Sequence, residues 1–270
     1  MKLIWQFAVQ IKRILIFVLS VLGIYLVYAF LLPEVWQRNN TLFAIIAIWF
    51  FTAYIVLPRV HRLLSKFYVP DHFIARSRTS DGLLSDPVNM ALIGDKRQLV
   101  AAMIKAGFDV ADEINPRTLW KSIKAYLLRR SYPNAPVSDA FLFGNKQVIT
   151  FQKEVDGNPH QRHHVRFWRT PRSWYLPGGF KVDWLGAATY DRAGGASFTT
   201  AQFTHLIDSD VDKERDYMIE ELNQAKTINK IQKIEHFSPG YTARNGFGHH
   251  YQTDGSMVIA QIRDSAHLKA

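Results

Sequence analysis

An uncharged apolar run from Ile14 to Leu32 is the feature that most restricts how this chain can fold. In a helix its 19 residues would span roughly 30 Å, the thickness of the hydrocarbon core of a bilayer. Residues 41–57 form a second uncharged run, and a short polar turn joins the two. Because lipid offers irregular backbone no hydrogen-bond partner, the pattern predicts a hairpin of transmembrane helices at about residues 14–32 and 41–57.

Basic residues flank this predicted hairpin on both sides. Lys12 and Arg13 precede the first run, and Arg59 and Arg62 follow the second. Cytoplasmic flanks carry an excess of Lys and Arg, so we expect both termini and the rest of the chain to be cytoplasmic. A cleaved signal peptide is the alternative, but the first run is too long and no small-residue cleavage site follows it.

Composition excludes several classes of site. The chain has 270 residues, a net charge of +10 and no cysteine. A disulfide framework, a thiolate zinc site, an iron–sulfur cluster and a cysteine nucleophile are therefore excluded. The sequence contains no P-loop, GxGxxG or GxSxG motif, so we predict no cofactor. The basic residues are dispersed, which argues against nucleic acid as a partner.

We divide the chain into a membrane anchor (1–66), a linker rich in turn-forming residues (67–84) and a cytosolic domain (85–270). Helical periodicity and caps predict helices over 96–106, 116–130 and 211–226. Strands are predicted over 88–93, 141–143, 148–153, 162–169, 184–190, 203–207, 231–237 and 257–262. The predicted fold class is therefore α+β, with a mixed or antiparallel sheet packed with helices behind a two-helix transmembrane hairpin.

Three basic side chains share one face of the predicted strand 162–169, because alternate residues of a strand point the same way. They are Arg162, His164 and Arg166. Such a row repels itself unless an acidic group lies opposite, and arginine binds phosphate or carboxylate in a bidentate fork. We predict an anion-binding site here, with Arg192 as a fourth member. The alternative is an internal network with Asp183 and Asp191, which bracket the next strand.

Histidines also allow a catalytic interpretation. His164 or His205 could act as general acid or base with Asp191 orienting it, because imidazole titrates near neutrality. A mixed metal site of His163, His164, His205, Asp191 and Asp208 is a further alternative. No HExxH or comparable motif supports it, and we predict no metal site.

The acids Asp208, Asp210 and Asp212 have the spacing of the start of a calcium loop. However, Lys213 stands where that loop needs glycine, and Ile219 where it needs glutamate. We therefore predict that these acids cap the helix that follows. The pair His249-His250 lies in a glycine-rich loop and is expected to be exposed.

Five segments, in this order, together resemble the LssY C-terminal domain family. They are residues 86–94, 132–138, 162–168, 184–191 and 205–216. The resemblance covers roughly residues 85–235 and implies a bacterial inner (plasma) membrane setting with an envelope-lipid context. Relatives often carry this domain fused to membrane phosphatases of the phosphatidic acid type-2 class or to DedA-like proteins. This chain lacks the phosphatase part, and the resemblance supplies no catalytic residues.

These observations predict a membrane-tethered binding or regulatory module that recognises an anionic group, such as a phospholipid headgroup or a phosphorylated metabolite. A lipid or phosphoester hydrolase that uses His and Asp is one alternative. An accessory or scaffold protein of a membrane or secretion assembly is another, and a basic strand paired with the protein's own acids would favour it. The expected partners are the lipid bilayer, anionic headgroups or another membrane protein.

Overall fold

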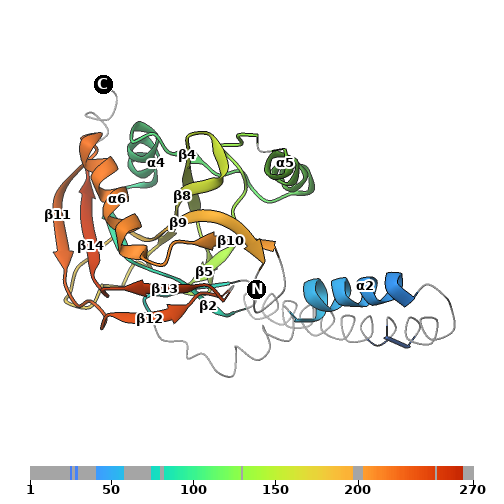
Figure 1. The fold of residues 1–270 in the computed structure, drawn as a ribbon. Helices are drawn as coiled ribbons and strands as arrows, with labels where there is room; N and C mark the ends of the chain where they lie inside the picture. Colours follow the sequence, from blue (N-terminus) through green and yellow to red (C-terminus); the bar gives the residue numbers. More distant parts are fainter. Residues whose placement is uncertain are drawn as a thin grey trace, which may run out of the picture. The chain divides into compact units, whose positions relative to one another are not determined.

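In a computed structural model the chain divides into two compact units, Met1–Val60 and His61–Ala270. The structure describes residues 25, 28–29, 41–57, 74–79, 82–128, 130–196, 203–246 and 248–263. Figure 1 shows their helices and strands.

The first unit contains α2 (Thr41–Phe51), which continues as a π-helical segment, η1 (Thr52–Val56). Among the described residues, no helix is long and apolar enough to cross a membrane. The predicted transmembrane hairpin is therefore wrong as a fold assignment. The 11 residues of α2 cover only about 17 Å before the hydrogen-bonding pattern changes at Thr52. The helix predicted at 14–32 lies outside the described residues, apart from residues 25, 28 and 29.

The second unit is built on an eight-stranded mixed sheet. Its strands are β3 (Met90–Ile93), β4 (Asp109–Val110), β7 (Ile149–Val155), β8 (Asn158–Arg169), β9 (Trp184–Ala196), β10 (Phe203–Ile207), β11 (Ile228–Ile234) and β14 (Met257–Ile262). Their order is β11-β14-β3-β9-β8-β7-β4, and β10 pairs with β9. β14 and β3 run parallel, whereas β7, β8 and β9 form an antiparallel meander at the centre.

Two helices, α4 (Lys96–Lys105) and α6 (Val211–Gln224), share an apolar core with one face of this sheet. Leu99 and Met103 of α4 and Met218 and Leu222 of α6 are fully buried in that core. α4 begins at a capping box, in which the side chains of Asp95 and Gln98 satisfy each other's backbone N–H groups. Both helices and their caps are predicted from local sequence signals and are confirmed.

A second, four-stranded sheet has the order β2-β1-β5-β6. Its strands are β1 (Arg76–Thr79), β2 (Leu84–Pro87), β5 (Ala140–Leu142) and β6 (Asn145–Lys146). Ala140 and Leu142 share a second apolar core with Trp168 and Leu185 of the large sheet. The large sheet is therefore covered by helices on one face and by the small sheet on the other.

Part of the predicted linker belongs to this small sheet, since β1 and the start of β2 lie within residues 67–84. The buried positions of β1 are the polar residues Ser77 and Thr79. The strand therefore has no alternation of apolar and polar residues from which it could be predicted. Gly82, at φ +87°, supplies the left-handed backbone of the turn to β2. Gly144, at φ +71°, lies in the turn that joins β5 to β6.

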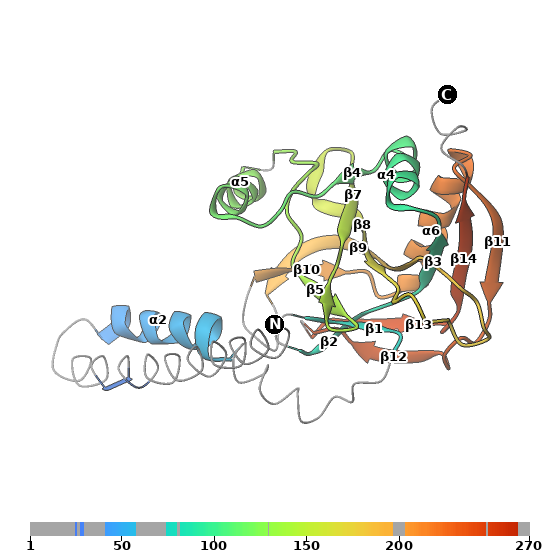
Figure 2. The ribbon, with the colours of Figure 1, turned by 180° about the vertical axis from the view of Figure 1, so that it is seen from behind.

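Two elements lie at the margin of this unit. The hairpin of β12 (Tyr241–Arg244) and β13 (His250–Thr253) contacts α6 and is not predicted from the sequence. The helix α5 (Pro116–Leu127) is predicted, and Figures 1 and 2 both show it at the periphery, apart from α4 and α6.

Candidate functional site

The predicted basic face of β8 is present and buried. Arg162, His164 and Arg166 are 7%, 3% and 5% exposed, on the side of the large sheet that faces the small sheet. Val165 and Phe167 point to the opposite face, into the core shared with α4 and α6. The two faces of the strand are therefore assigned correctly from the alternation of its residues.

Each basic side chain of this face has its own buried carboxylate. The pairs are Arg166 with Asp86 (Nη1 to Oδ2, 3.0 Å), Arg162 with Glu154 (Nη2 to Oε1, 3.5 Å) and His164 with Asp191 (Nδ1 to Oδ2, 3.4 Å). We call these six side chains the Arg/His layer. Buried charges are tolerated only beside such partners, because desolvation is costly. Two guanidinium groups and one imidazole face three carboxylates, so the layer has no excess positive charge.

Burial dominates the electrostatics of Arg162. It lowers the pKa of the guanidinium, while the nearby carboxylates of Glu154 and Asp191 oppose that shift. The Nε atom of Arg162 is buried and has no hydrogen-bond partner. Arg162 is thus held by charge pairing more than by a complete set of hydrogen bonds.

His164 has both ring nitrogens engaged. Its Nε2 lies 3.0 Å from Nη1 of Arg166 and 2.7 Å from the hydroxyl oxygen of Thr189. Arginine can only donate, so Nε2 accepts and the ring proton lies on Nδ1, which faces Asp191. Both nitrogens of the imidazole thus face groups of the protein itself in this arrangement.

The segment 131–138 closes over the layer. Nε2 of Gln152 donates to the carbonyl oxygens of Pro133 and Ala135 at 2.6 and 2.7 Å. Nη2 of Arg166 donates to the hydroxyl of Ser138 at 3.3 Å. Side chains from the central strands therefore hold this proline-containing segment in place.

The remaining predicted site residues are not all brought into the layer. Asp191 joins it, but Arg192 is exposed and Asp183 instead accepts a hydrogen bond from the backbone N–H of Gly94 at 2.8 Å. His205 pairs through its backbone with Gly194, and its side chain lies outside the described part of the structure.

His249, expected to be exposed, approaches the layer. Asn245 fixes its loop, since the backbone N–H of His249 donates to Asn245 Oδ1 at 3.0 Å. Both ring nitrogens are buried and have no hydrogen-bond partner. Burial lowers the pKa of His249, whereas the nearby carboxylates of Asp86 and Asp191 oppose this and Arg192 adds to it. No spacing in the sequence indicates this placement; the adjacent His250 is exposed, as expected.

His163 lies on the other face of β8, so it cannot share a metal ion with His164. Its Nδ1 is 2.8 Å from Oε2 of Glu214, and its ring stacks on Tyr217 with centroids 4.0 Å apart. Burial raises the pKa of Glu214, and His163 partly offsets this shift. Within the described residues, no group of three or more His, Cys, Asp or Glu side chains could hold a metal ion.

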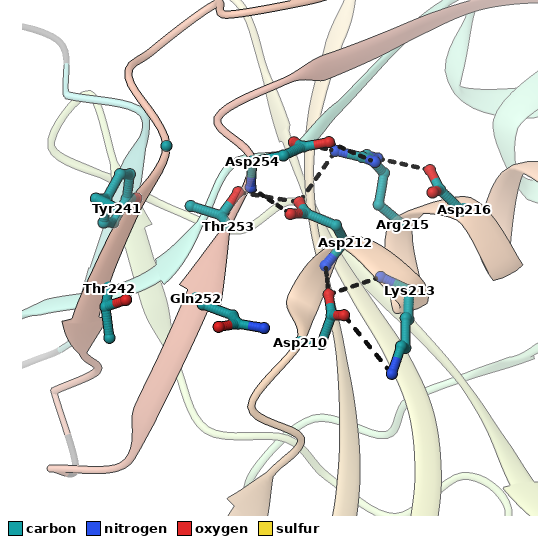
Figure 3. A pocket seen from close by; sticks show the side chains of 11 residues that line it. Asp210, Asp212, Lys213, Arg215, Asp216, Tyr241, Thr242, Gln252, Thr253 and Asp254 are labelled. Atoms are coloured by element: carbon teal, nitrogen blue, oxygen red, sulfur yellow. Dashed lines mark hydrogen bonds and ion pairs between the residues drawn. The ribbon is translucent and has the colours of Figure 1, made fainter.

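A pocket of about 620 Å³ lies where α6 meets the β12–β13 hairpin (Figure 3). One of its lining residues is Arg215, which is 1% exposed and donates to Asp212, Asp254 and Asp216 at 3.0, 2.9 and 2.8 Å. Burial acts to lower the pKa of Arg215, but these hydrogen bonds outweigh it and raise the pKa. Three acids of this pocket, Asp212, Asp216 and Asp254, thus pair with a cation of the protein itself.

Asp210 caps α6, as predicted. Its side chain accepts from the backbone N–H groups of Asp212 and Lys213, and Asp208 accepts from that of Asp210. The bonds of Asp210 satisfy N–H groups that the first helical turn leaves free, as expected. Asp212, also expected to cap the helix, instead accepts from Arg215 and from the hydroxyl of Thr253.

Comparison with known proteins gives one match. A family model described as the LssY C-terminus matches residues 66–257, well over half of the chain. The matched range contains the Arg/His layer, the closing segment 131–138 and the pocket around Arg215. No curated protein and no solved structure matches the chain.

Proposed function

The chain belongs to the LssY C-terminus family, as its sequence motifs indicate, and we propose that its domain is a non-catalytic interaction module. One observation carries this proposal: Arg162, His164 and Arg166, the basic side chains on the buried face of the predicted anion-binding strand, each have a buried carboxylate of their own. This is the feature that favours the accessory alternative over the anion-binding and hydrolase interpretations. The proposed location, the bacterial inner membrane, rests on the family resemblance alone.

Anion binding in the Arg/His layer requires positive charge that the protein leaves uncompensated. A phosphate that bound Arg166 would have to displace Asp86, which would then be a buried carboxylate without a partner. Such a group is expensive in a poorly solvated interior, so the exchange is unfavourable.

The layer has a structural role in this proposal. Asp86 comes from β2, Arg166 from β8 and Asp191 from β9, so their contacts join the small sheet to the large one. Buried polar pairs tolerate little displacement, because their strength depends on geometry. In this proposal the layer fixes the position of the small sheet on the large sheet. Partners would then bind at the surface of the module and not within the layer.

Thermal unfolding of the full chain tests the proposal. The probes are inorganic phosphate, glycerol phosphate, magnesium and zinc, each titrated over a wide concentration range. A ligand that binds only the folded state adds about 2.7 kcal/mol of stability at a hundredfold excess over its dissociation constant. We expect no saturable stabilisation by any of them. Saturable stabilisation that disappears in the Arg166→Ala variant would overturn the proposal.

One observation favours the hydrolase as a second candidate. The imidazole of His249 is unpartnered, lies near Asp191 and has a lowered pKa, so it is neutral at pH 7 and able to accept a proton. Phosphoester turnover abolished by His249→Ala but retained by His250→Ala would support this candidate. His250 is the matched control because it is adjacent in sequence and exposed. Equal turnover by the two variants would remove His249 from the reaction.

A further inference from the structure

The helix α5 turns its apolar residues away from the protein. Leu119, Trp120, Ile123 and Leu127 are 50%, 68%, 43% and 74% exposed. They follow the spacing of one helical face, because residues three to four positions apart lie above one another. By contrast, the apolar faces of α4 and α6 are buried in the core.

The opposite face of α5 attaches it to the domain. Ala125 is buried in a small cluster with Tyr132 and Ala135. Ile123 and Leu127 lie two positions before and after Ala125, and at 100° per residue each is rotated by about 160° from it. The exposed apolar face is therefore directed outward by the way in which the helix is anchored.

Positive charge borders this apolar face. α5 contains Arg117, Lys121 and Lys124 and no acidic residue. The exposed Arg130 follows its end. Lys121 lies on the attached side, because its Nζ is 3.8 Å above the ring of Tyr132, so the bases of the helix that border the apolar face are Arg117 and Lys124. An apolar face with an aromatic residue, flanked by bases, is the pattern of helices that lie in the interface of an anionic membrane.

We propose that α5 docks on the surface of an anionic lipid bilayer, lying in the plane of the interface with Trp120, Ile123 and Leu127 inserted. The bases provide charge complementarity to the headgroups, and the apolar face gains by leaving water. A second copy of the chain suits this surface less well, because an isologous α5–α5 contact would place two basic helices side by side. The proposal names a partner for the interaction module but depends on α5 alone. A substrate found to bind and react beside His249 would thus overturn the proposed non-catalytic function and leave the proposal for α5 intact.

The absence of cysteine allows a direct test on the full chain. An environment-sensitive fluorophore is attached to the single cysteine of the Ile123→Cys variant. Vesicles are made of phosphatidylcholine alone or of phosphatidylcholine mixed with phosphatidylglycerol, with and without a lipid-borne quencher. We expect a blue shift and quenching with the anionic vesicles only. The matched control is Ser173→Cys, on an exposed loop residue, whose emission stays that of a solvated probe.

A charge variant provides the second measurement. Arg117→Gln with Lys124→Gln removes two exposed bases, and each base near an anionic surface contributes about a fivefold factor in binding. We expect the response of the probe to require about 30-fold more anionic lipid. Lys181→Gln with Lys230→Gln, which removes two exposed bases outside α5, should leave that response unchanged.

Three outcomes would overturn the proposal. The first is a probe at position 123 that stays solvated on vesicles to which the chain is bound. The second is an equal response on neutral and anionic vesicles. The third is a probe already blue-shifted without vesicles, because another part of the chain or a second copy then covers the face.

Discussion

Nη1 of Arg166 donates a hydrogen bond to Oδ2 of Asp86 at 3.0 Å, although 80 residues separate them in the chain. Both side chains are buried, and the pair joins a strand of the small sheet to the centre of the large one. The same guanidinium contacts His164 and Ser138. One residue thus holds together three parts of the domain that lie far apart in sequence.

Removing this guanidinium should destabilise the fold. In Arg166→Ala the Asp86 carboxylate stays buried without its partner, so we expect a loss of about 3–5 kcal/mol in the free energy of unfolding. Urea unfolding monitored by tryptophan fluorescence measures it. Arg172→Ala, an exposed arginine, should change the value by less than about 0.5 kcal/mol. The double variant Asp86→Ala with Arg166→Ala should cost clearly less than the sum of the single variants; additive costs would contradict the pairing.

His249 should make the stability pH-dependent. Burial holds its folded-state pKa below the ordinary value of 6.5, so below pH 6.5 the unfolded chain binds a proton that the folded chain does not. The contribution of His249 to stability is therefore complete above pH 6.5. It is lost as the pH falls from 6.5 toward the lower pKa of the folded state. The groups that act on the imidazole are Asp86, Asp191 and Arg192.

The measurement is the unfolding midpoint between pH 5 and 8 for three proteins. We expect His249→Gln to have a flatter profile below pH 6.5 than the parent and His250→Gln to follow the parent, because His250 is exposed. Identical slopes in all three would show that His249 does not titrate differently in the two states.

Local signals in the sequence predict the helices well. The capping box of Asp95 and Gln98 and the Asp210 cap act within one turn of chain, so α4 and α6 follow from a few residues. The prediction of transmembrane helices depends on the length, apolar character and lack of charge of each run. These properties do not predict that α2 ends at Phe51 and is followed by a π-helical segment from Thr52.

The partners within the site depend on contacts that no local pattern encodes. Alternation along β8 places Arg162, His164 and Arg166 on one face, but it cannot tell an internal acid from a ligand. Of their three carboxylates, only Asp191 is anticipated, because it lies on the neighbouring strand. Asp86 comes from a segment 80 residues away, and a glycine-rich loop brings His249 to the layer.

Arg215 should be essential for the junction of α6 with the β12–β13 hairpin. Replacing it by Met removes its ion pairs with Asp212, Asp216 and Asp254, of which only Asp212 is mostly buried. Asp254 keeps Lys233 at 3.2 Å, so we expect a loss of about 1–3 kcal/mol. Lys213→Met, two positions earlier on the same helix, is the control, because its side chain is 80% exposed. Equal unfolding free energies for the two variants would contradict a stabilising role of the Arg215 ion pairs.

Gly186 allows the close approach of β3, β8 and β9, and a single methyl group tests this packing. A Cβ at position 186 would lie 2.6 Å from Cγ of Met90 and 2.8 Å from Cε1 of Phe167, well inside van der Waals contact. Met90 and Phe167 are fully buried in the core beneath α4 and α6, so neither side chain can move without displacing its neighbours. Overpacking of this kind costs about 1–3 kcal/mol, which we expect for Gly186→Ala in urea unfolding.

The second variant, Gly186→Ala with Met90→Ala, removes the closest contact but opens space around Phe167. Its cost should therefore be smaller than the sum of the two single changes, because the new methyl group occupies part of the space vacated by Met90. A Gly186→Ala protein as stable as the parent would mean that the strands at this point separate more easily than a close-packed core permits.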